Sequence, residues 1–143
     1  MLSWSRNFEG LPEHLTEVRE FTRLVAGACD GADLIEMIAS ELAGNAIQHS
    51  ASGGPNGKFT LQVVDCHDRW QVHVVDEGGP IVPHVCELAS IDTAEELDKL
   101  GDEAEAGRGL AMVAAVSSAW GVFGDQSSRM VWAEIMTPGR VTL

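Results

Sequence analysis

The order of apolar and polar residues predicts a strand followed by two helices in the first third of the chain. Residues 2–10 alternate apolar and polar side chains, as a strand with one buried face does. From Pro12 to about Gly27, apolar side chains recur at three- and four-residue spacing, which predicts a helix with proline in its first turn. A second apolar stripe over residues 32–49 predicts a second helix, which ends before the loop ASGGPNG at residues 51–57.

The rest of the pattern predicts two strand pairs with a helix between them. Residues 58–66 and 70–76 are two apolar runs around a polar turn, typical of an antiparallel hairpin. Residues 119–124 and 129–136 form a second such pair, and residues 107–119 predict a helix that opens with two glycines. Antiparallel pairs with helices gathered on one face indicate an α+β fold, a two-layer α/β sandwich with a mixed, mostly antiparallel sheet.

An acidic segment interrupts this pattern between residues 77 and 106. Residues 87–105 hold eight acidic side chains against one base, Lys99, which accounts for −7 of the formal net charge of −13. A connection of this length in a compact domain is usually a lid or binding loop, or else a disordered segment. We expect one domain, residues 1–143, with a lid at about residues 77–106.

Composition narrows the class of protein. A chain of 143 residues, 45% hydrophobic, suffices for one domain with its own core. No apolar run could span a membrane and the first ten residues do not resemble a signal peptide, so we expect a cytoplasmic protein without membrane association. The three cysteines lack the spacing of a zinc site or a disulfide framework. A net charge of −13 opposes binding to phosphate backbones and argues against a nucleic-acid partner.

Candidate chemistry begins on the second predicted helix. The stretch ELAGNAIQHS places Glu41, Asn45 and His49 at four-residue intervals, and therefore on one helix face. Carboxylate and amide oxygens suit a hard cation such as Mg²⁺, which often keeps water ligands while it bridges substrate phosphates. A solvated helix face explains the same residues, and His49 is equally explained by capping or by the core.

Two glycine-containing segments add to this helix. VVDEGGP puts Asp76 at the end of an apolar strand and Gly78 directly after it, where the backbone can let a ligand approach. AGRGLAMV puts Gly107 and Gly109 at the opening of a helix, where free N–H groups and the helix dipole favour an anion such as phosphate. Each segment alone is also an ordinary turn or cap. The three segments together, in this order, are much less common.

These segments resemble the N, G1 and G2 boxes of the GHKL ATPase superfamily. From about Phe8 to Ile135 the chain is similar to the anti-sigma-factor serine/threonine kinases of bacterial partner-switching systems. The resemblance implies the Bergerat fold, ATP and Mg²⁺ as cofactors, and phosphorylation of an anti-sigma factor antagonist of the STAS type. It also implies a sigma factor as a second partner and a homodimer.

The resemblance further implies a role for each matching residue. Glu41 matches the general base, and Asn45 matches the Mg²⁺ ligand that ties the metal to the ATP phosphates. Asp76 matches the acceptor for the adenine amino group, with Gly78 lining the base pocket. The segment at the phosphates consists of Gly107, Arg108, Gly109 and Leu110.

Two positions depart from the family pattern. Pro80 stands where D-x-G-x-G has its last glycine, and proline removes a backbone donor. The last strand of the family often carries a threonine near the position of Met130 that helps to hold the adenine-binding aspartate; here either Ser128 substitutes for it or the contact is missing. The alternative function is therefore a catalytically weak or inactive ATP-binding module that acts through protein interaction.

Overall fold

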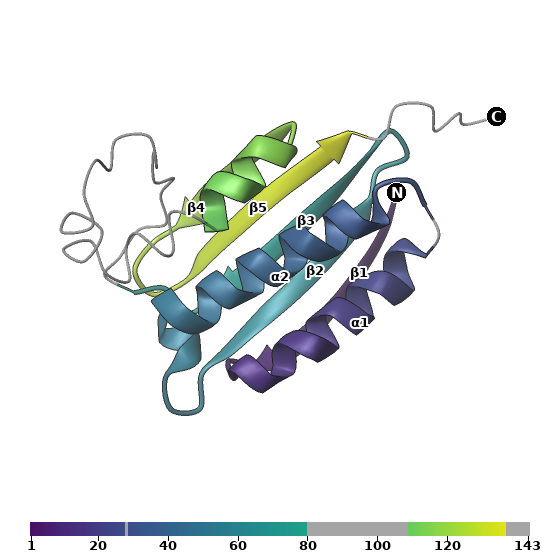
Figure 1. The fold of residues 1–143 in the computed structure, drawn as a ribbon. Helices are drawn as coiled ribbons and strands as arrows, with labels where there is room; N and C mark the ends of the chain where they lie inside the picture. Colours follow the sequence, from purple (N-terminus) through teal and green to yellow (C-terminus); the bar gives the residue numbers. More distant parts are fainter. Residues whose placement is uncertain (28, 80–108, 137–143) are drawn as a thin grey trace, which may run out of the picture.

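The computed structural model describes residues 1–27, 29–79 and 109–136, which form a sheet with helices on one face (Figure 1). The predicted α+β two-layer sandwich is confirmed. The elements are β1 (Leu2–Glu9), η1 (Pro12–His14), α1 (Leu15–Ala26), α2 (Ala32–His49), η2 (Ala51–Gly53), β2 (Lys58–Asp65), β3 (Arg69–Asp76), a helical segment at residues 109–116, β4 (Ala119–Gly124) and β5 (Arg129–Met136).

The strand order of the sheet is β1-β2-β3-β5-β4, and over the described residues every neighbouring pair is antiparallel. The sheet expected as mixed is thus antiparallel throughout this part of the chain. Both predicted hairpins, β2–β3 and β4–β5, are present. The last strand lies between β3 and β4, which sets the start of β5 beside the end of β3, with Arg129 opposite Asp76.

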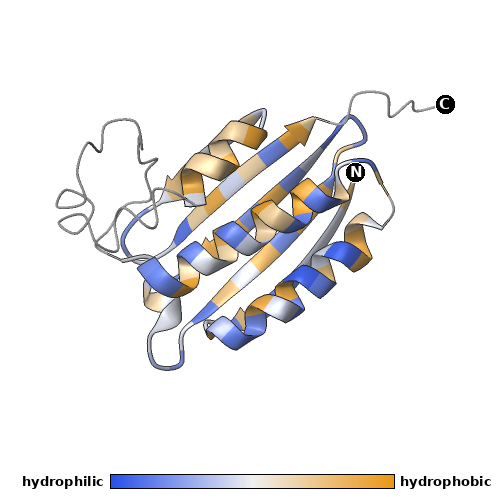
Figure 2. Ribbon diagram, viewed as in Figure 1, coloured by the Kyte–Doolittle hydropathy of each residue, from blue (hydrophilic) through white to orange (hydrophobic). Residues whose placement is uncertain are grey.

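The core lies between the sheet and the helices. Along the strands apolar and polar residues alternate, and the helices present apolar stripes among polar ones (Figure 2). Each fully buried Val, Leu, Ile or Phe contributes about 1.5–3 kcal/mol to folding. The largest fully buried side chains are Val18, Ile35, Ile38, Leu42, Phe59, Leu61, Val63, Val72, Val74, Leu110, Val113 and Val131.

Packing against this core fixes the rotation of helix α2 about its own axis. Seven of its residues are buried, so its remaining face carries the half-buried Glu41 and Asn45. At its C-terminal end the Ser50 hydroxyl donates to the Ala46 carbonyl at 2.6 Å and accepts from the Ser52 N–H at 3.1 Å. Within the described ranges, no helix combines the length and the apolar character needed to cross a bilayer.

The predicted lid falls almost entirely outside the described residues. Of the segment at about residues 77–106, only 77–79 are described, and Pro80, Gly107 and Arg108 lie beyond the described ranges. The lid and the single-domain organisation stay predictions.

Candidate functional site

The polar face of α2 lines a cavity of about 330 Å³. Glu41, Asn45 and His49 all border it, as the four-residue spacing predicts, and Gly109 closes it from the helical segment at residues 109–116. Three of the predicted site residues, from segments far apart in the sequence, thus meet in one cavity.

Two polar atoms of this cavity are buried without a hydrogen-bond partner among the described residues. Asn45 Oδ1 and His49 Nε2 make no hydrogen bond to the described part of the chain. Leaving such an atom unsatisfied costs about 1–3 kcal/mol, so we expect a ligand, a water or a residue outside the described ranges to pair with it. An amide oxygen is an acceptor and a ligand for hard cations, which fits the metal role predicted for Asn45.

Gly109 brings its segment close to the Glu41 side chain. A Cβ atom on this glycine would lie 2.8 Å from Glu41 Oε2. The next residue, Leu110, is 1% exposed and anchors the segment in the core. A side chain at position 109 would therefore displace the carboxylate that the sequence predicts as the general base.

Asp76 ends β3 and is buried, with 3% of its surface exposed. Its Oδ1 accepts a hydrogen bond from the Gly78 N–H at 2.6 Å. Gly78 has φ 76° and lies against the main chain of Gln126 so closely that a Cβ atom would clash. The glycine predicted at this position is needed both for its backbone conformation and for space.

A buried arginine lies beside Asp76, and the sequence analysis missed it. Arg129 faces Asp76 across the β3–β5 pair, is 3% exposed, and places Nε 3.7 Å from Asp76 Oδ1. The family's threonine was expected near Met130, but Met130 pairs with Val75 and projects from the opposite face of the sheet, so the residue of β5 that faces Asp76 is Arg129. The alternation of β5, with Arg129 on the face of Val131, is the signal that identifies it.

The loop after β3 lies against the C-terminal end of α2. The Ala51 N–H donates to the Gly78 carbonyl at 2.7 Å, and a Cβ atom on Gly79 would lie 3.6 Å from the His49 carbonyl oxygen. Asp76 itself lines a different cavity, of about 280 Å³. The structure therefore places Asp76 and Gly78 beside the end of α2 without bringing them into the cavity of Glu41 and Asn45.

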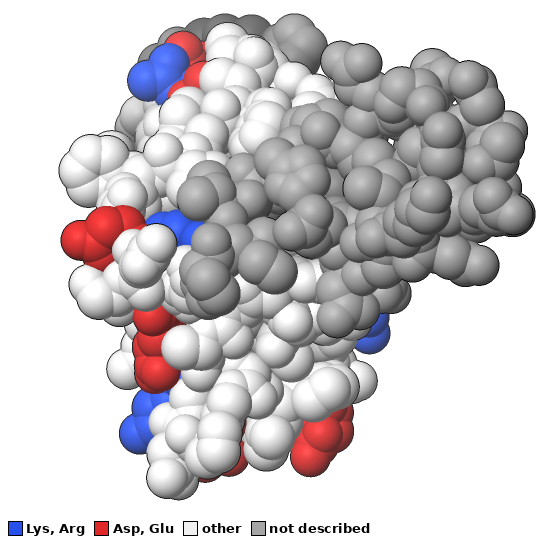
Figure 3. All heavy atoms as spheres, turned by 90° about the vertical axis from the view of Figure 1, so that its left-hand side faces the viewer, with Lys and Arg blue, Asp and Glu red and all other residues white. Residues whose placement is uncertain are grey.

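The surface at this end of the molecule is mostly uncharged over the described residues. Acidic and basic side chains are interspersed on it and do not gather into one patch of either sign (Figure 3). The acidic segment at residues 87–105, with most of the net charge, lies outside the described ranges.

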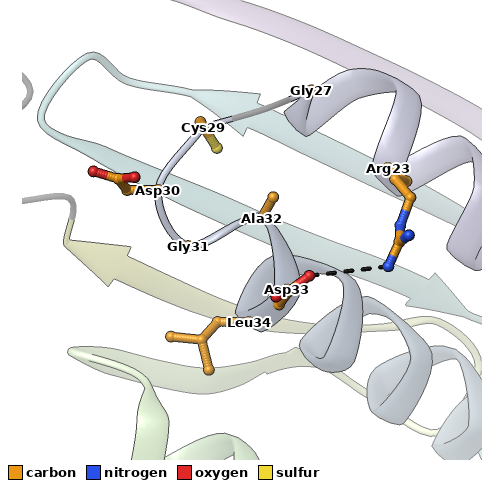
Figure 4. Close-up of a pocket in the computed structure, with 8 residues that line it drawn as sticks. All are labelled: Arg23, Gly27, Cys29, Asp30, Gly31, Ala32, Asp33 and Leu34. Atoms are coloured by element: carbon orange, nitrogen blue, oxygen red, sulfur yellow. Dashed lines mark ion pairs between the residues drawn. The ribbon is translucent and has the colours of Figure 1, made fainter.

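A further cavity, of about 600 Å³, lies at the connection between α1 and α2 (Figure 4). Arg23 lines it and forms ion pairs with Glu36 at 2.7 Å and Asp33 at 3.9 Å. The Arg23 side chain is 67% exposed, and an ion pair so exposed contributes little to stability. None of the predicted site residues borders this cavity, so we assign it no role in the site.

Burial gives Asp76 a pH-dependent effect on stability. Desolvation raises the pKa of its carboxyl group, while the Gly78 N–H and the Arg129 guanidinium oppose that rise. A group whose pKa is higher in the folded than in the unfolded state stabilises most below its unfolded pKa, and this contribution is lost as pH rises through the folded pKa.

We therefore expect the difference in unfolding free energy, unaltered chain minus Asp76→Asn, to fall as pH rises from the ordinary aspartate range upward. Urea unfolding of both chains at a series of pH values measures this difference. Only its slope matters, because the variant also changes stability by an amount that does not depend on pH. A rising slope would contradict the burial effect.

Comparison with known proteins connects these residues to a family. The model of the histidine kinase-like ATPase domain matches residues 8–132. A chain of the SiaB–SiaC complex from Pseudomonas aeruginosa superposes with a TM-score of 0.62, over 92% of this chain and 88% of that chain, at 18% identity. At this identity the likeness shows a shared fold and no more. No curated protein matches the chain significantly.

Proposed function

The chain belongs to the histidine kinase-like ATPase family, and we propose that it is an ATP-dependent serine/threonine-protein kinase and anti-sigma-factor-like regulator. Its substrate in this proposal is an anti-sigma factor antagonist of the STAS type. The observation that carries the proposal is the cavity in which Glu41, Asn45 and Gly109 meet, with the Asn45 oxygen buried and unpartnered by the described residues.

Asn45 fits the ligand expected for Mg²⁺. The described residues hold no group of three or more His, Cys, Asp and Glu side chains that would enclose a metal by themselves. Mg²⁺ usually keeps several waters and shares its remaining ligands with substrate phosphates, so one amide oxygen is a suitable protein contribution. When bound, the ion would neutralise charge on the phosphates.

Glu41 fits the general base. Its carboxylate is half-buried at the cavity and lies close to the segment that begins at Gly109. In the proposed reaction it accepts the proton of a serine or threonine hydroxyl on the partner protein. Phosphoryl transfer depends mainly on positioning and charge neutralisation, which the backbone near Gly109 and the metal ligand Asn45 would provide. Asp76 would accept a hydrogen bond from the adenine amino group.

A protein partner is supported by the complex in which the structural neighbour was solved, SiaB–SiaC. We propose a STAS-type antagonist and a sigma factor as partners, a homodimer as the assembly and the cytoplasm as the location, all on the resemblance to the partner-switching kinases. Incubation with ATP, Mg²⁺ and candidate antagonists, followed by intact mass spectrometry, tests the proposal. Addition of one phosphate group to an antagonist is the expected result.

The alternative is a catalytically weak or inactive ATP-binding module of the same fold. Pro80, in place of a glycine of D-x-G-x-G, favours it. Nucleotide binding without phosphate transfer to any antagonist would support this alternative over the kinase.

The metal assignment predicts that Asn45→Ala removes the effect of Mg²⁺ on nucleotide binding. We expect ATP affinity in Mg²⁺ to fall about 10- to 100-fold, the loss typical of weakened metal coordination, while affinity in chelator stays the same. Calorimetry with Mg²⁺ and with EDTA measures both values. Gln48→Ala is the matched control, because Gln48 is exposed and borders the same cavity. If Mg²⁺ affects nucleotide binding to Asn45→Ala as it does for the unaltered chain, Asn45 is not a ligand of the metal.

A further inference from the structure

Arg129 is a charged residue of the site to which the proposed function assigns no task. It begins β5 on the inner face of the sheet, directly opposite Asp76, and is 3% exposed. Arginine is almost never buried to this degree unless it is paired. Here the paired carboxylate is the one proposed to contact the nucleotide base.

The guanidinium is held against the end of β3 and the glycine turn that follows. Its Nε lies 3.7 Å from Asp76 Oδ1, and its Nη1 donates to the Gly79 carbonyl at 3.5 Å. The Gly78 N–H donates to the same Asp76 oxygen. Because withdrawal of the arginine would leave a buried carboxylate uncompensated, the guanidinium stays in place beside Asp76.

Asp76 and Arg129 therefore offer complementary hydrogen-bonding groups side by side. An ionised carboxylate only accepts, whereas a guanidinium only donates, through five N–H groups in a planar fork. A flat ligand edge that carries a donor next to an acceptor matches this pair. Adenine has such an edge, because its amino group adjoins the ring nitrogen N1.

We propose that Arg129 is a specificity-determining residue of the nucleotide site, donating to adenine N1 while Asp76 accepts from the neighbouring amino group. The inference rests on the proposed nucleotide binding and adds to it a side chain that donates a hydrogen bond directly to the ring nitrogen N1. A buried donor of this kind also discriminates strongly between bases, since a base without an acceptor at this position leaves the donor unsatisfied.

The pair selects adenine over guanine for the same reason. Guanine carries a carbonyl oxygen where adenine has its amino group, and a protonated N1 where adenine has an acceptor. In the same orientation the carbonyl would face the Asp76 carboxylate and the N1–H would face the Arg129 guanidinium. Both contacts are repulsive, so GDP is expected to bind more weakly than ADP.

The test changes the ligand and leaves the full chain unaltered. Calorimetry compares ADP with 1-deaza-ADP, in which a C–H group replaces N1, and with 3-deaza-ADP as the control of equal shape. We expect 1-deaza-ADP to bind roughly 10- to 100-fold more weakly than ADP, the loss of a charge-assisted hydrogen bond. The affinity of 3-deaza-ADP should stay near that of ADP.

A variant supplies the second arm of the test. In Arg129→Met, ADP and 1-deaza-ADP should bind equally, because methionine has no donor for N1. If this variant fails to fold, the comparison of ligands on the unaltered chain decides by itself.

The outcomes separate this inference from the function on which it rests. Equal binding of ADP and 1-deaza-ADP to the unaltered chain would overturn the role of Arg129 alone. Tighter binding of GDP than of ADP would overturn the adenine orientation. No binding of either nucleotide would overturn the proposed function, and the inference with it.

Discussion

A Glu41→Gln variant is expected to bind Mg-ATP as the unaltered chain does and to phosphorylate the antagonist about 10²- to 10⁴-fold more slowly, the usual contribution of a general base. Glutamine keeps the size of the side chain, so it fits beside Gly109, where a Cβ atom would already lie 2.8 Å from Glu41 Oε2. The amide cannot take up the hydroxyl proton. Binding is measured by calorimetry, and transfer by the mass of the antagonist over time.

A second glutamate of α2 provides the control for this variant. Glu36 lies on the same helix and pairs with Arg23 at 2.7 Å, away from the cavity of Asn45. Glu36→Gln removes the same charge from the chain and should leave the transfer rate unchanged. Transfer at the unaltered rate in Glu41→Gln would show that another group accepts the proton.

The polar face of α2 could be predicted because it depends on one helical period. Once the apolar stripe is buried, residues four apart must share the opposite face, and Glu41, Asn45 and His49 do line one cavity. The strands could be predicted equally well from the sequence, since the alternation of their side chains depends only on neighbouring residues. Local periodicity thus specifies which side chains point away from the core.

The partner of Asp76 could not be predicted in this way. It depends on β5 lying between β3 and β4, a long-range pairing that local pattern does not reveal. Without the register, the sequence indicates only the neighbourhood of Met130 and Ser128, and Met130 projects from the other face of the sheet. The register shows that the residue opposite Asp76 is the buried Arg129, one position before Met130. The proposed base pocket therefore contains a charged donor and not a thioether.

The β3–β5 pairing contributes both to the stability of the sheet and to the geometry of the site. Asp76 and Arg129 connect β3 to β5, and the Gly78 carbonyl accepts a hydrogen bond from the Ala51 N–H at the start of η2. A residue proposed to read the base is therefore also part of the contact between strands. Substitutions here are expected to change folding and binding together, so each needs a stability measurement beside its affinity.

Arg129→Leu is expected to lower the free energy of unfolding by about 3–5 kcal/mol, because it leaves the Asp76 carboxylate buried without its counter-charge. That loss is a large share of the roughly 5–15 kcal/mol by which a domain is stable. Urea unfolding followed by circular dichroism measures it. Arg23→Leu is the control: the ion pair of Arg23 with Glu36 is shorter, at 2.7 Å, but the Arg23 side chain is 67% exposed, so little change is expected.

The double variant Asp76→Asn with Arg129→Leu separates loss of charge pairing from loss of packing. The asparagine is neutral and its oxygen can still accept the Gly78 N–H, so no buried charge is left over once leucine replaces the arginine. Most of the stability lost in Arg129→Leu should then return. If the double variant unfolds as easily as Arg129→Leu, the arginine stabilises the sheet by filling space, and the uncompensated carboxylate is not the cause of the loss.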